Sequence, residues 1–353
     1  MQTPPDTSPV HFTPHNILVT GGAGFIASHV IIRLVKAYPQ YNLVNLDRIS
    51  YCSCHANVSS VIGDATNYKF VKGDIRSSDL VSYVLRTEQI DTILHFAAQT
   101  HVDNSFGNSF QFTQHNIMGT HVLLEAAKNA AVRRFIHVST DEVYGEGCDA
   151  SGEMLEEDAL EPTNPYAATK AGAEFLVKAY QRSFKLPAII TRGNNVYGPH
   201  QFPEKLIPKF TNQLLRGRAV TLHGDGSNTR NFLHVDDVAA AFDILLHKGD
   251  VGQIYNIGGS HELSNRAVAQ DIIRVLGLAD REDALISYVP DRHFNDLRYT
   301  IDSSKLRELG WREKITWAEG LRQTVEWYKR HTDRFANIEQ ALVAHPRFGE
   351  GSC

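Results

Sequence analysis

The sequence lacks the long apolar run that a membrane-spanning helix requires. No stretch of its 353 residues approaches the roughly 18 consecutive apolar residues of such a helix. Residues 1–13 are polar and rich in proline, without the apolar centre of a secretory signal. We therefore expect a cytoplasmic protein with no membrane partner, in which residues 1–13 and 348–353 are flexible tails.

Cysteine is also scarce, which argues against a disulfide framework and against a zinc site. The sequence has four cysteines, and only Cys52 and Cys54 lie close together. A structural zinc site needs a second pair of ligands, which the cysteine pattern does not supply. The 17 histidines are scattered, and the one HxxxH spacing falls in the polar leader. We assign no metal and expect free thiols.

The chain has no excess of basic charge. It carries 35 Lys and Arg against 40 Asp and Glu, for a formal net charge of -5, and 42% of its residues are hydrophobic. This balance gives no reason to expect a nucleic-acid partner. The length and apolar content suffice for a sizeable core, which we expect to be divided between two lobes.

A glycine-rich turn near the N-terminus points to a dinucleotide site. Residues 16–20 form a predicted buried strand that runs into the turn 21–24 (GGAG), and a helical pattern then continues to about residue 37. Glycines in such a turn let the backbone approach a pyrophosphate, whose charge the helix N-terminus favours. A lone glycine cluster also occurs in ordinary turns. We assign the dinucleotide role to Gly21, Gly24, Phe25 and Ile26.

The ends of the next strands carry side chains that suit bound NAD. Asp47 ends the strand predicted at residues 42–46, where a carboxylate can hold ribose hydroxyls and repel a 2′-phosphate. This favours NAD over NADP, although the neighbouring Arg48 could pair with a phosphate. Two further strands are predicted within residues 68–75 and 92–100. Ordinary strand-to-loop transitions look the same, but we also assign to the cofactor the residues at their ends: Asp74, Ile75, Ala97, Ala98 and Thr100.

Two neighbouring carboxyl groups and a hydroxyl follow the predicted strand at residues 134–138. Thr140, Asp141 and Glu142 should lie at the carboxyl end of this strand, where open parallel sheets bind ligands. A regular strand would point the two acids to opposite faces, so a shared site requires the backbone to leave strand geometry here. Crowded carboxyls in a dry pocket resist ionising together, which suits one acid and one base. A solvated acidic loop is the alternative.

Tyr166 and Lys170 lie four residues apart in a predicted helix over residues 166–183. This spacing places both side chains on one face, so the ammonium group of Lys170 can lie near the phenol. We expect this cation, together with an oxidised nicotinamide, to lower the pKa of Tyr166 enough for the phenolate to accept a proton from a sugar hydroxyl. Many helices hold such a pair by chance, so the neighbouring acids must support the interpretation.

The alternation of strands and helices predicts an α/β fold, a Rossmann-type doubly wound parallel sheet with a smaller C-terminal α/β substrate lobe. We expect residues 14–194 to form the NAD-binding domain, with residues 230–257 returning to it. Residues 195–229 and 258–347 should form the nucleotide-sugar-binding lobe. The Pro- and Gly-rich segments after residue 191 mark the boundary.

Residues 139–145 (STDEVYG), together with Tyr166 and Lys170, resemble the signature of nucleotide-sugar 4,6-dehydratases in the extended short-chain dehydrogenase/reductase superfamily. The resemblance implies that Tyr166 takes the C4 hydroxyl proton, Glu142 takes the C5 proton, and Asp141 protonates the departing C6 hydroxyl. It also implies that Thr140 hydrogen-bonds at C4, and that Lys170 and Tyr166 contact the cofactor. It further implies a substrate cleft formed by Asn195, Glu204, Lys205, Leu206, Arg230, Arg292 and Tyr299.

Three segments, residues 101–110, 191–198 and 294–299, look most similar to the UDP-glucose 4,6-dehydratase domain of plant-type rhamnose synthases. This implies a lyase that converts UDP-glucose to UDP-4-keto-6-deoxy-glucose, the first step of UDP-rhamnose synthesis. dTDP-glucose is the alternative substrate, but His223 and His261 stand where bacterial dTDP-glucose enzymes usually carry tyrosine and asparagine. His293 replaces a proline that is usual in both families.

Other functions remain open at this stage. A UDP-sugar 4-epimerase would share the fold but has no use for both Asp141 and Glu142. A non-catalytic NAD-sensing module could keep the glycine turn and Asp47 without the acids and Tyr166. The resemblance also implies a homodimer, formed through the helices near residues 111 and 166. Because the rhamnose synthases continue into a further domain, we expect a separate epimerase/reductase to act on the product.

Overall fold

The structure is a computed structural model that describes residues 12–145, 152–290, 300–335 and 338–343. The tail predicted at residues 348–353, and residues 1–11 of the leader, lie outside the described residues. Phe12 is described: its backbone N–H donates to the carbonyl of His247 at 3.1 Å, and its ring lies 4.3 Å from the Arg134 guanidinium. Among the described residues, no helix combines the length and the apolar character needed to cross a membrane.

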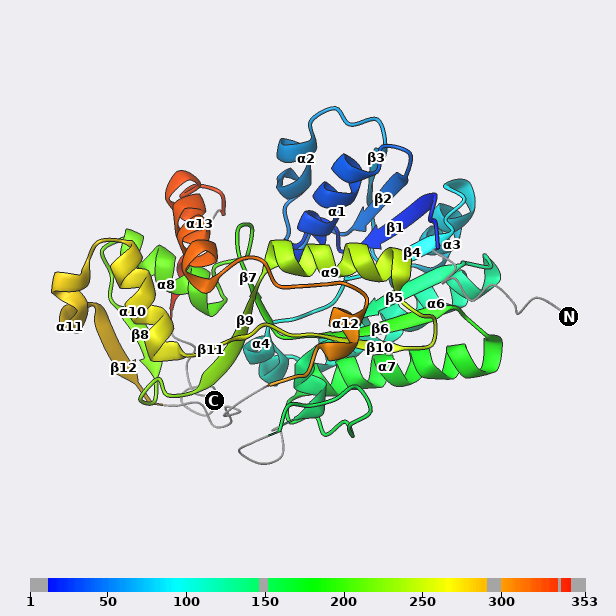
Figure 1. The fold of residues 1–353 in the computed structure, drawn as a ribbon. Helices are drawn as coiled ribbons and strands as arrows, with labels where there is room; N and C mark the ends of the chain where they lie inside the picture. Colours follow the sequence, from blue (N-terminus) through cyan, green and yellow to red (C-terminus); the bar gives the residue numbers. More distant parts are fainter. Residues whose placement is uncertain (1–11, 146–151, 291–299, 336–337, 344–353) are drawn as a thin grey trace, which may run out of the picture.

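A seven-stranded sheet forms the larger lobe, and all its strands are parallel (Figure 1). The strand order is β10-β6-β5-β4-β1-β2-β3, so the winding reverses between β1 and β4, and ligands bind at such a reversal. The predicted doubly wound sheet is confirmed. Its strands are β1 (Asn16–Thr20), β2 (Asn42–Asp47), β3 (Tyr68–Lys72), β4 (Thr92–His95), β5 (Arg134–Val138), β6 (Ala188–Gly193) and β10 (Ile254–Ile257).

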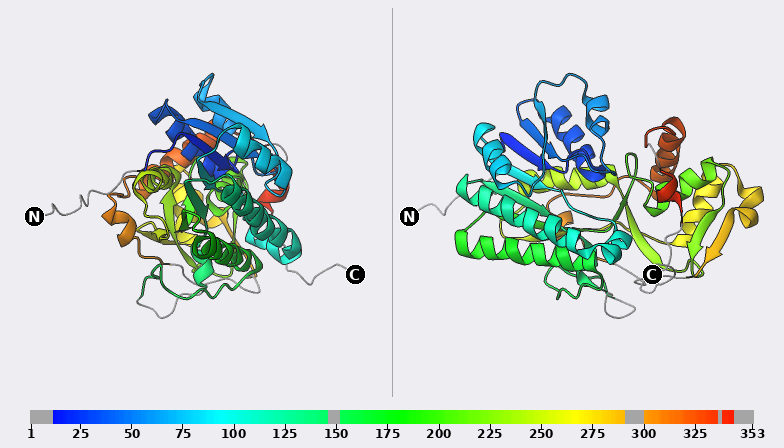
Figure 2. Two further views of the ribbon diagram at one scale, coloured as in Figure 1. Left: turned by 90° about the vertical axis from the view of Figure 1, so that its right-hand side faces the viewer. Right: turned by 180° about the vertical axis from the view of Figure 1, so that it is seen from behind.

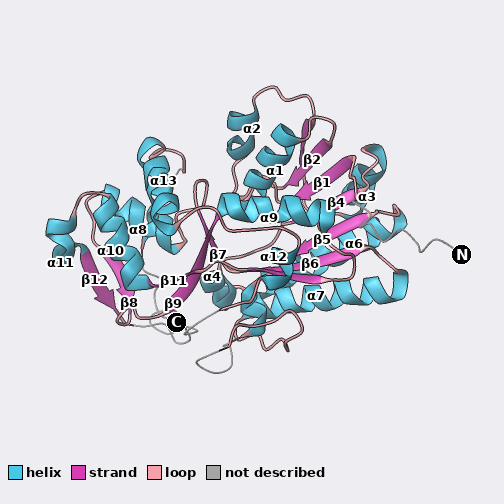
Figure 3. Cartoon of the chain, in the orientation of Figure 1, coloured by secondary structure: helices cyan, strands magenta, loops and turns pink. Residues whose placement is uncertain are grey.

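Helices cover both faces of this sheet (Figure 3). Successive strand residues point to opposite faces, so Ile17 joins the core beneath one helical layer and Leu18 joins the core beneath the other. Helices α1 (Phe25–Ala37), α2 (Ala56–Ile62) and α9 (Val235–Lys248) pack on the first face. Helices α3 (Ser78–Thr87), α6 (Gly119–Asn129) and α7 (Pro165–Phe184) pack on the second.

The helical segment near residue 111 is not one regular helix. It begins as α5 (Ser109–Phe112), passes through the π-helical turn η1 (Thr113–Met118), and only then becomes α6. Within the π turn, Asn116 accepts from the N–H of Gln99 at 2.8 Å and donates to its carbonyl at 3.0 Å. The wider π turn therefore holds the side chain of Asn116 against the loop that follows β4. Such π turns often occur at functional sites.

The smaller lobe has its own core and two small sheets. A three-stranded sheet contains β7 (Asn195–Tyr197), β9 (Thr229–His234) and β11 (His261–Ser264), and a two-stranded sheet pairs β8 (Val220–His223) with β12 (Ile286–Val289). Their apolar side chains pack with α8 (Leu206–Leu215), α10 (Asn265–Val275) and α13 (Trp317–Arg330). The remaining short helices are α4 (Val102–Gly107), η3 (Ala279–Arg281), α11 (Glu282–Leu285), α12 (Ser304–Glu308) and α14 (Glu339–Leu342).

The chain passes between the two lobes more than once. Residues 229–234 form β9 in the three-stranded sheet, after which α9 and β10 return to the large sheet. The two lobes are thus connected by more than one segment of the chain and not by a single hinge. This arrangement sets the carboxyl ends of the large sheet opposite the smaller lobe (Figures 1 and 2).

Candidate active site

A cleft of about 520 Å³ lies between the carboxyl ends of the large sheet and the smaller lobe. The glycine turn, the end of β5 and the start of α7 line it on one side, and the start of α8 lines it on the other. The residues that were predicted from sequence and line this cleft are Gly21, Gly24, Phe25, Ile26, Asp47, Asp74, Ile75, Ala97, Ala98, Thr100, Thr140, Glu142, Tyr166, Lys170, Asn195, Glu204, Lys205, Leu206 and Arg230.

Among the predicted site residues that the structure describes, Asp141 is not in this lining. Asp141 is buried beside the cleft, with 4% of its surface exposed. Arg292 and Tyr299, which the resemblance assigned to the substrate, lie outside the described residues, as does His293.

The glycine turn has the shape that a dinucleotide requires. Gly21 has a φ of +72°, and a Cβ placed on it would lie 2.8 Å from backbone atoms of Ala97. Asp47 fixes the turn from the end of β2, because its carboxylate accepts from the N–H groups of Ala23 at 3.0 Å and Ile49 at 2.7 Å. Burial raises the pKa of Asp47, although these hydrogen bonds oppose the rise. The left-handed glycine turn before α1 and the buried carboxylate together fit the pyrophosphate and ribose of a dinucleotide.

Arg48, which could have paired with a 2′-phosphate, already has partners. Its Nη1 lies 2.6 Å from Nε2 of His115 and 3.8 Å from a carboxylate oxygen of Asp74. Asp74 in turn accepts from Arg76 at 2.8 Å, and although burial acts to raise the pKa of Asp74, Arg76 holds it below its ordinary value. Arg48 is therefore held by His115 and shares the Asp74 carboxylate with Arg76.

The backbone leaves strand geometry directly after β5, as a shared acid site requires. Thr140 is extended, with φ -143°, and its Oγ1 accepts from the N–H of Glu142 at 3.3 Å, which begins the 3-10 turn η2 (Asp141–Tyr144). Threonine favours this capping role because its hydroxyl satisfies an N–H that the helix leaves unpaired. The turn directs Glu142 to the cleft and Asp141 inward.

Two asparagines, which sequence reasoning missed, hold the acid pair. Asn194 donates from Nδ2 to Oδ2 of Asp141 at 2.7 Å. Asn164 caps α7 by accepting from the N–H of Ala167, and its Nδ2 donates to Glu142 at 3.0 Å. The position of Asn164 directly before a proline at a helix start was a readable signal of a cap. No local pattern marks Asn194, because its contact joins residues 53 apart in sequence.

Burial governs the proton affinity of Asp141. Loss of water, followed by the negative charge of Glu142, raises the pKa of Asp141 to about 7. Hydrogen bonds from Asn194 and Thr140 oppose this rise because they favour the carboxylate. Asp141 can therefore be protonated near neutral pH, as a general acid must be.

Tyr166 and Lys170 lie on the cleft face of α7, as their spacing predicts. Nζ of Lys170 donates to the carbonyl of Val138 at 2.5 Å, and burial lowers the pKa of Lys170 to about 8. Burial and the charge of Glu142 raise the pKa of Tyr166, while a hydrogen bond with Thr140 opposes the rise. In the protein alone the pKa of Tyr166 is thus shifted upward, and the lowering expected with an oxidised nicotinamide bound stays a prediction.

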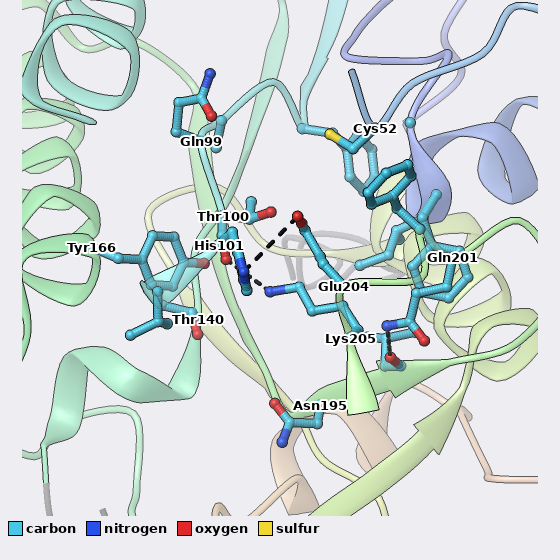
Figure 4. Close-up of a pocket in the computed structure, with 18 of the residues that line it drawn as sticks. Cys52, Gln99, Thr100, His101, Thr140, Tyr166, Asn195, Gln201, Glu204 and Lys205 are labelled. Atoms are coloured by element: carbon cyan, nitrogen blue, oxygen red, sulfur yellow. Dashed lines mark hydrogen bonds and ion pairs between the residues drawn. The ribbon is translucent and has the colours of Figure 1, made fainter. Parts of the chain in front are cut away.

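Side chains of the smaller lobe face this group across the cleft (Figure 4). Lys205 donates to the carbonyl of Thr100 at 2.9 Å, and Glu204 lies 4.0 Å from Nε2 of His101. Tyr51, from the loop after β2, donates to Glu204 at 2.9 Å. His101 and Tyr51 were missed from the sequence, since neither lies in a recognisable motif. Both lobes therefore shape the region where a sugar would meet Tyr166.

The sequence profile of the GDP-mannose 4,6 dehydratase family matches residues 18–324. The chain belongs to this family. It is 58% identical over 338 residues to a protein of Arabidopsis thaliana named trifunctional UDP-glucose 4,6-dehydratase/UDP-4-keto-6-deoxy-D-glucose 3,5-epimerase/UDP-4-keto-L-rhamnose-reductase, a match that covers 95% of this chain and 50% of that protein. The chain thus spans about half the length of the plant relatives it matches.

Two further relatives match along nearly their whole length. The dTDP-D-glucose 4,6-dehydratase of Homo sapiens is 49% identical over 333 residues, which are 94% of each chain. The crystal structure of the dTDP-glucose 4,6-dehydratase DesIV of Streptomyces venezuelae, with NAD and TYD bound, has 42% identity and a TM-score of 0.86 over 92% of this chain and 99% of that one.

Proposed function

We propose that this protein is an NAD-dependent UDP-glucose 4,6-dehydratase, which converts UDP-glucose to UDP-4-keto-6-deoxy-glucose and water. One observation carries the proposal: a single cleft joins a dinucleotide turn to Tyr166, Lys170, Thr140 and Glu142, with Asp141 buried beside it. The 58% identity to a plant protein named for this activity supports it.

NAD, when bound, would accept a hydride from C4 of the sugar and return it to C6. The chain has a suitable place for it, because Gly21 gives the glycine turn its left-handed backbone and the Asp47 carboxylate suits the ribose hydroxyls. The same carboxylate, which would repel a 2′-phosphate, favours NAD over NADP. Ala97 and Ala98 leave space at the end of β4.

Proton transfer at C4 falls to Tyr166. Its phenol lies beside Thr140, and both line the cleft (Figure 4). A neutral tyrosine is a weak base, so the hydroxyl of Thr140 and the ammonium of Lys170 must stabilise the phenolate as the C4 proton moves. Lys170 also lines the cleft, and it would hold the nicotinamide ribose from the same helix face as Tyr166.

Elimination of water falls to the two acids. Oxidation at C4 makes the C5–H acidic, and Glu142, which lines the cleft, is placed to remove it. Asp141, with its raised pKa, carries the proton that the departing C6 hydroxyl needs. Two carboxyls with different surroundings thus divide the acid and base roles.

dTDP-glucose is the second candidate substrate, favoured by the 49% identity to a human dTDP-D-glucose 4,6-dehydratase. We propose UDP because the identity to the plant proteins is higher. His223, which stands where the resemblance implies a tyrosine in bacterial dTDP-glucose enzymes, also lines the cleft. The 3,5-epimerase and reductase activities named in the plant relatives are the reactions that we propose to consume the product.

We also propose a homodimer formed through α5, η1 and α7. These segments carry large exposed side chains, with Phe110 at 69%, Met118 at 56% and Phe175 at 59% exposure. Figure 2 shows α6 and α7 lying side by side along one open face. Light scattering should give twice the monomer mass, and Phe175→Asp should shift the protein toward monomer. We further propose a cytoplasmic location, supported by the free thiols of Cys52 and Cys54.

Product mass tests the activity directly. The protein, supplied with NAD, is offered UDP-glucose, dTDP-glucose and GDP-mannose in separate reactions, and the products are analysed by mass spectrometry. We expect loss of one water from UDP-glucose, faster than from the other two sugars. An unchanged mass with a new sugar configuration would indicate a 4-epimerase, and no turnover of any sugar would favour a non-catalytic NAD-binding module.

A further inference from the structure

Asn194 is a buried polar side chain that joins two segments far apart in sequence. It follows β6, has 6% of its surface exposed, and lines the cleft. Its Oδ1 accepts from the N–H of Gly259 at 3.1 Å, and its Nδ2 donates to Oδ2 of Asp141 at 2.7 Å. The side chain thus links the loop after β10 to the turn that carries the acid.

The Gly259 contact fixes which end of the amide faces Asp141. A backbone N–H can only donate, so the oxygen of the Asn194 amide must face Gly259, and its NH₂ group must therefore face the carboxyl group. Asn231 holds the same glycine from the other side, donating to its carbonyl at 2.9 Å. The amide of Asn194 therefore cannot turn over without losing both hydrogen bonds.

We propose that Asn194 is a positioning residue for Asp141. Its fixed N–H holds Oδ2 of Asp141 and thereby confines the acid proton to Oδ1. A proton on Oδ2 would meet the N–H of Asn194, and two donors repel. Oδ1 instead lies 3.2 Å from Oγ1 of Thr140, a cleft hydroxyl that donates to the carboxylate and can turn to accept when Oδ1 carries the proton. The proton is thereby kept on the side of the cleft.

The same N–H also limits how tightly Asp141 holds its proton. Burial and Glu142, its neighbour in η2, favour the protonated acid, whereas Asn194, Thr140 and Arg230 on β9 favour the carboxylate. Tyr166 faces the pair from α7 and is itself held neutral. Among these groups, Asn194 makes the shortest hydrogen bond that the structure records to Asp141. Removing its donor should make Asp141 a weaker acid.

Infrared spectroscopy can follow the proton of Asp141 without any substrate. In pH-difference spectra of the NAD-loaded protein, the carbonyl band of this protonated carboxyl is identified by its loss in Asp141→Asn. In Asn194→Ala the band should titrate about one pH unit higher than in the parent protein, because one hydrogen bond to the carboxylate is lost. In Asn194→Asp, which keeps the size and the acceptor for Gly259 but adds a carboxyl, the shift should be larger.

Asn231→Ala is the matched control, because it removes the other hydrogen bond to Gly259 without touching Asp141. In this variant the Asp141 band should titrate at the same pH as in the parent protein. If Asn194→Ala does not fold, the isosteric Asn194→Asp still gives the test. A band that titrates at the parent pH in a folded Asn194 variant would overturn the proposal. So would an equal shift in Asn231→Ala.

The consequence for turnover rests on the proposed function. With UDP-glucose, kcat of Asn194→Ala should fall about tenfold at the pH optimum, and its decline at high pH should move upward with the infrared titration. Lack of dehydration by the parent protein would refute the proposed function and leave the infrared result standing. Parent turnover together with an unshifted band would refute the role of Asn194 alone.

Discussion

Replacing Asp141 with asparagine should stabilise the folded protein above neutral pH while it abolishes activity. Asp141 is 4% exposed, and burial, followed by the charge of Glu142, raises its pKa to about 7. An asparagine fits the same space. Its oxygen can accept from Asn194 and its NH₂ can donate to Thr140, so neither hydrogen bond of the site is lost.

The sign and size of the effect follow from the two pKa values. The unfolded chain releases this proton near a pKa of roughly 4, whereas the folded protein keeps it until pH reaches about 7. Between these values the native state binds more protons, so the free energy of unfolding contributed by Asp141 falls as pH rises. A difference of about three pH units sets an upper bound of ~4 kcal/mol above pH 7. Local relaxation reduces the expected gain of Asp141→Asn to about 2 kcal/mol.

Denaturant unfolding at pH 4 and pH 8 measures this difference. Asp141→Asn should match the parent at pH 4 and exceed it at pH 8. Asp74→Asn is the control of opposite sign, because Arg76 lowers the pKa of Asp74 and its carboxylate stabilises the fold, so this variant should lose stability at pH 8. A gain for Asp141→Asn that is equal at both pH values, or a loss at pH 8, would refute the reasoning.

Three further predictions concern other parts of the molecule. Glu142→Gln should let C4 be oxidised but stop proton removal at C5, so absorbance of NADH should accumulate on mixing with UDP-glucose; full turnover would exclude Glu142 from the chemistry. Gly21→Ala should lose most NAD affinity in a fluorescence titration, because its φ is +72° and a Cβ would contact backbone, whereas Gly63→Ala, with φ +56° but open space around it, should bind NAD normally. Arg192→Met should lower the free energy of unfolding by about 3–5 kcal/mol, since it leaves the buried Glu174 carboxylate without the guanidinium that contacts it at 2.7 Å; unfolding at the parent denaturant concentration would contradict this.

The sequence was most informative where chemistry follows local spacing. The strand at residues 134–138 and the face shared by Tyr166 and Lys170 could be predicted because strand and helix periods are short and regular. The need for a break after the strand could also be stated, but not its form as a 3-10 turn. Local sequence pattern predicted where this strand ends, and the position of the acids followed from that.

The rest depended on contacts between distant segments, which no short pattern encodes. The Asn194 contact with Asp141 requires β5 and β6 to pair in register, and Asn116 reaches Gln99 only because a π turn widens the helix. The raised pKa of Tyr166 has the same origin, since burial is a property of the assembled protein. Spacing alone indicated that a cation could lie near the phenol, but not that burial and Glu142 raise the pKa of that phenol.

Burial displaces three ionisable groups of this site toward their uncharged forms: it raises the pKa of Tyr166 and Asp141 and lowers that of Lys170. In such a dry site a new charge is stabilised mainly by the few groups that contact it, because water is not there to do so. A proton that moves at one residue therefore changes the proton affinity of the others, as Glu142 already does for both Asp141 and Tyr166. Effects of substitutions at these positions should consequently not add, and a role assigned to one residue describes the state of the whole group.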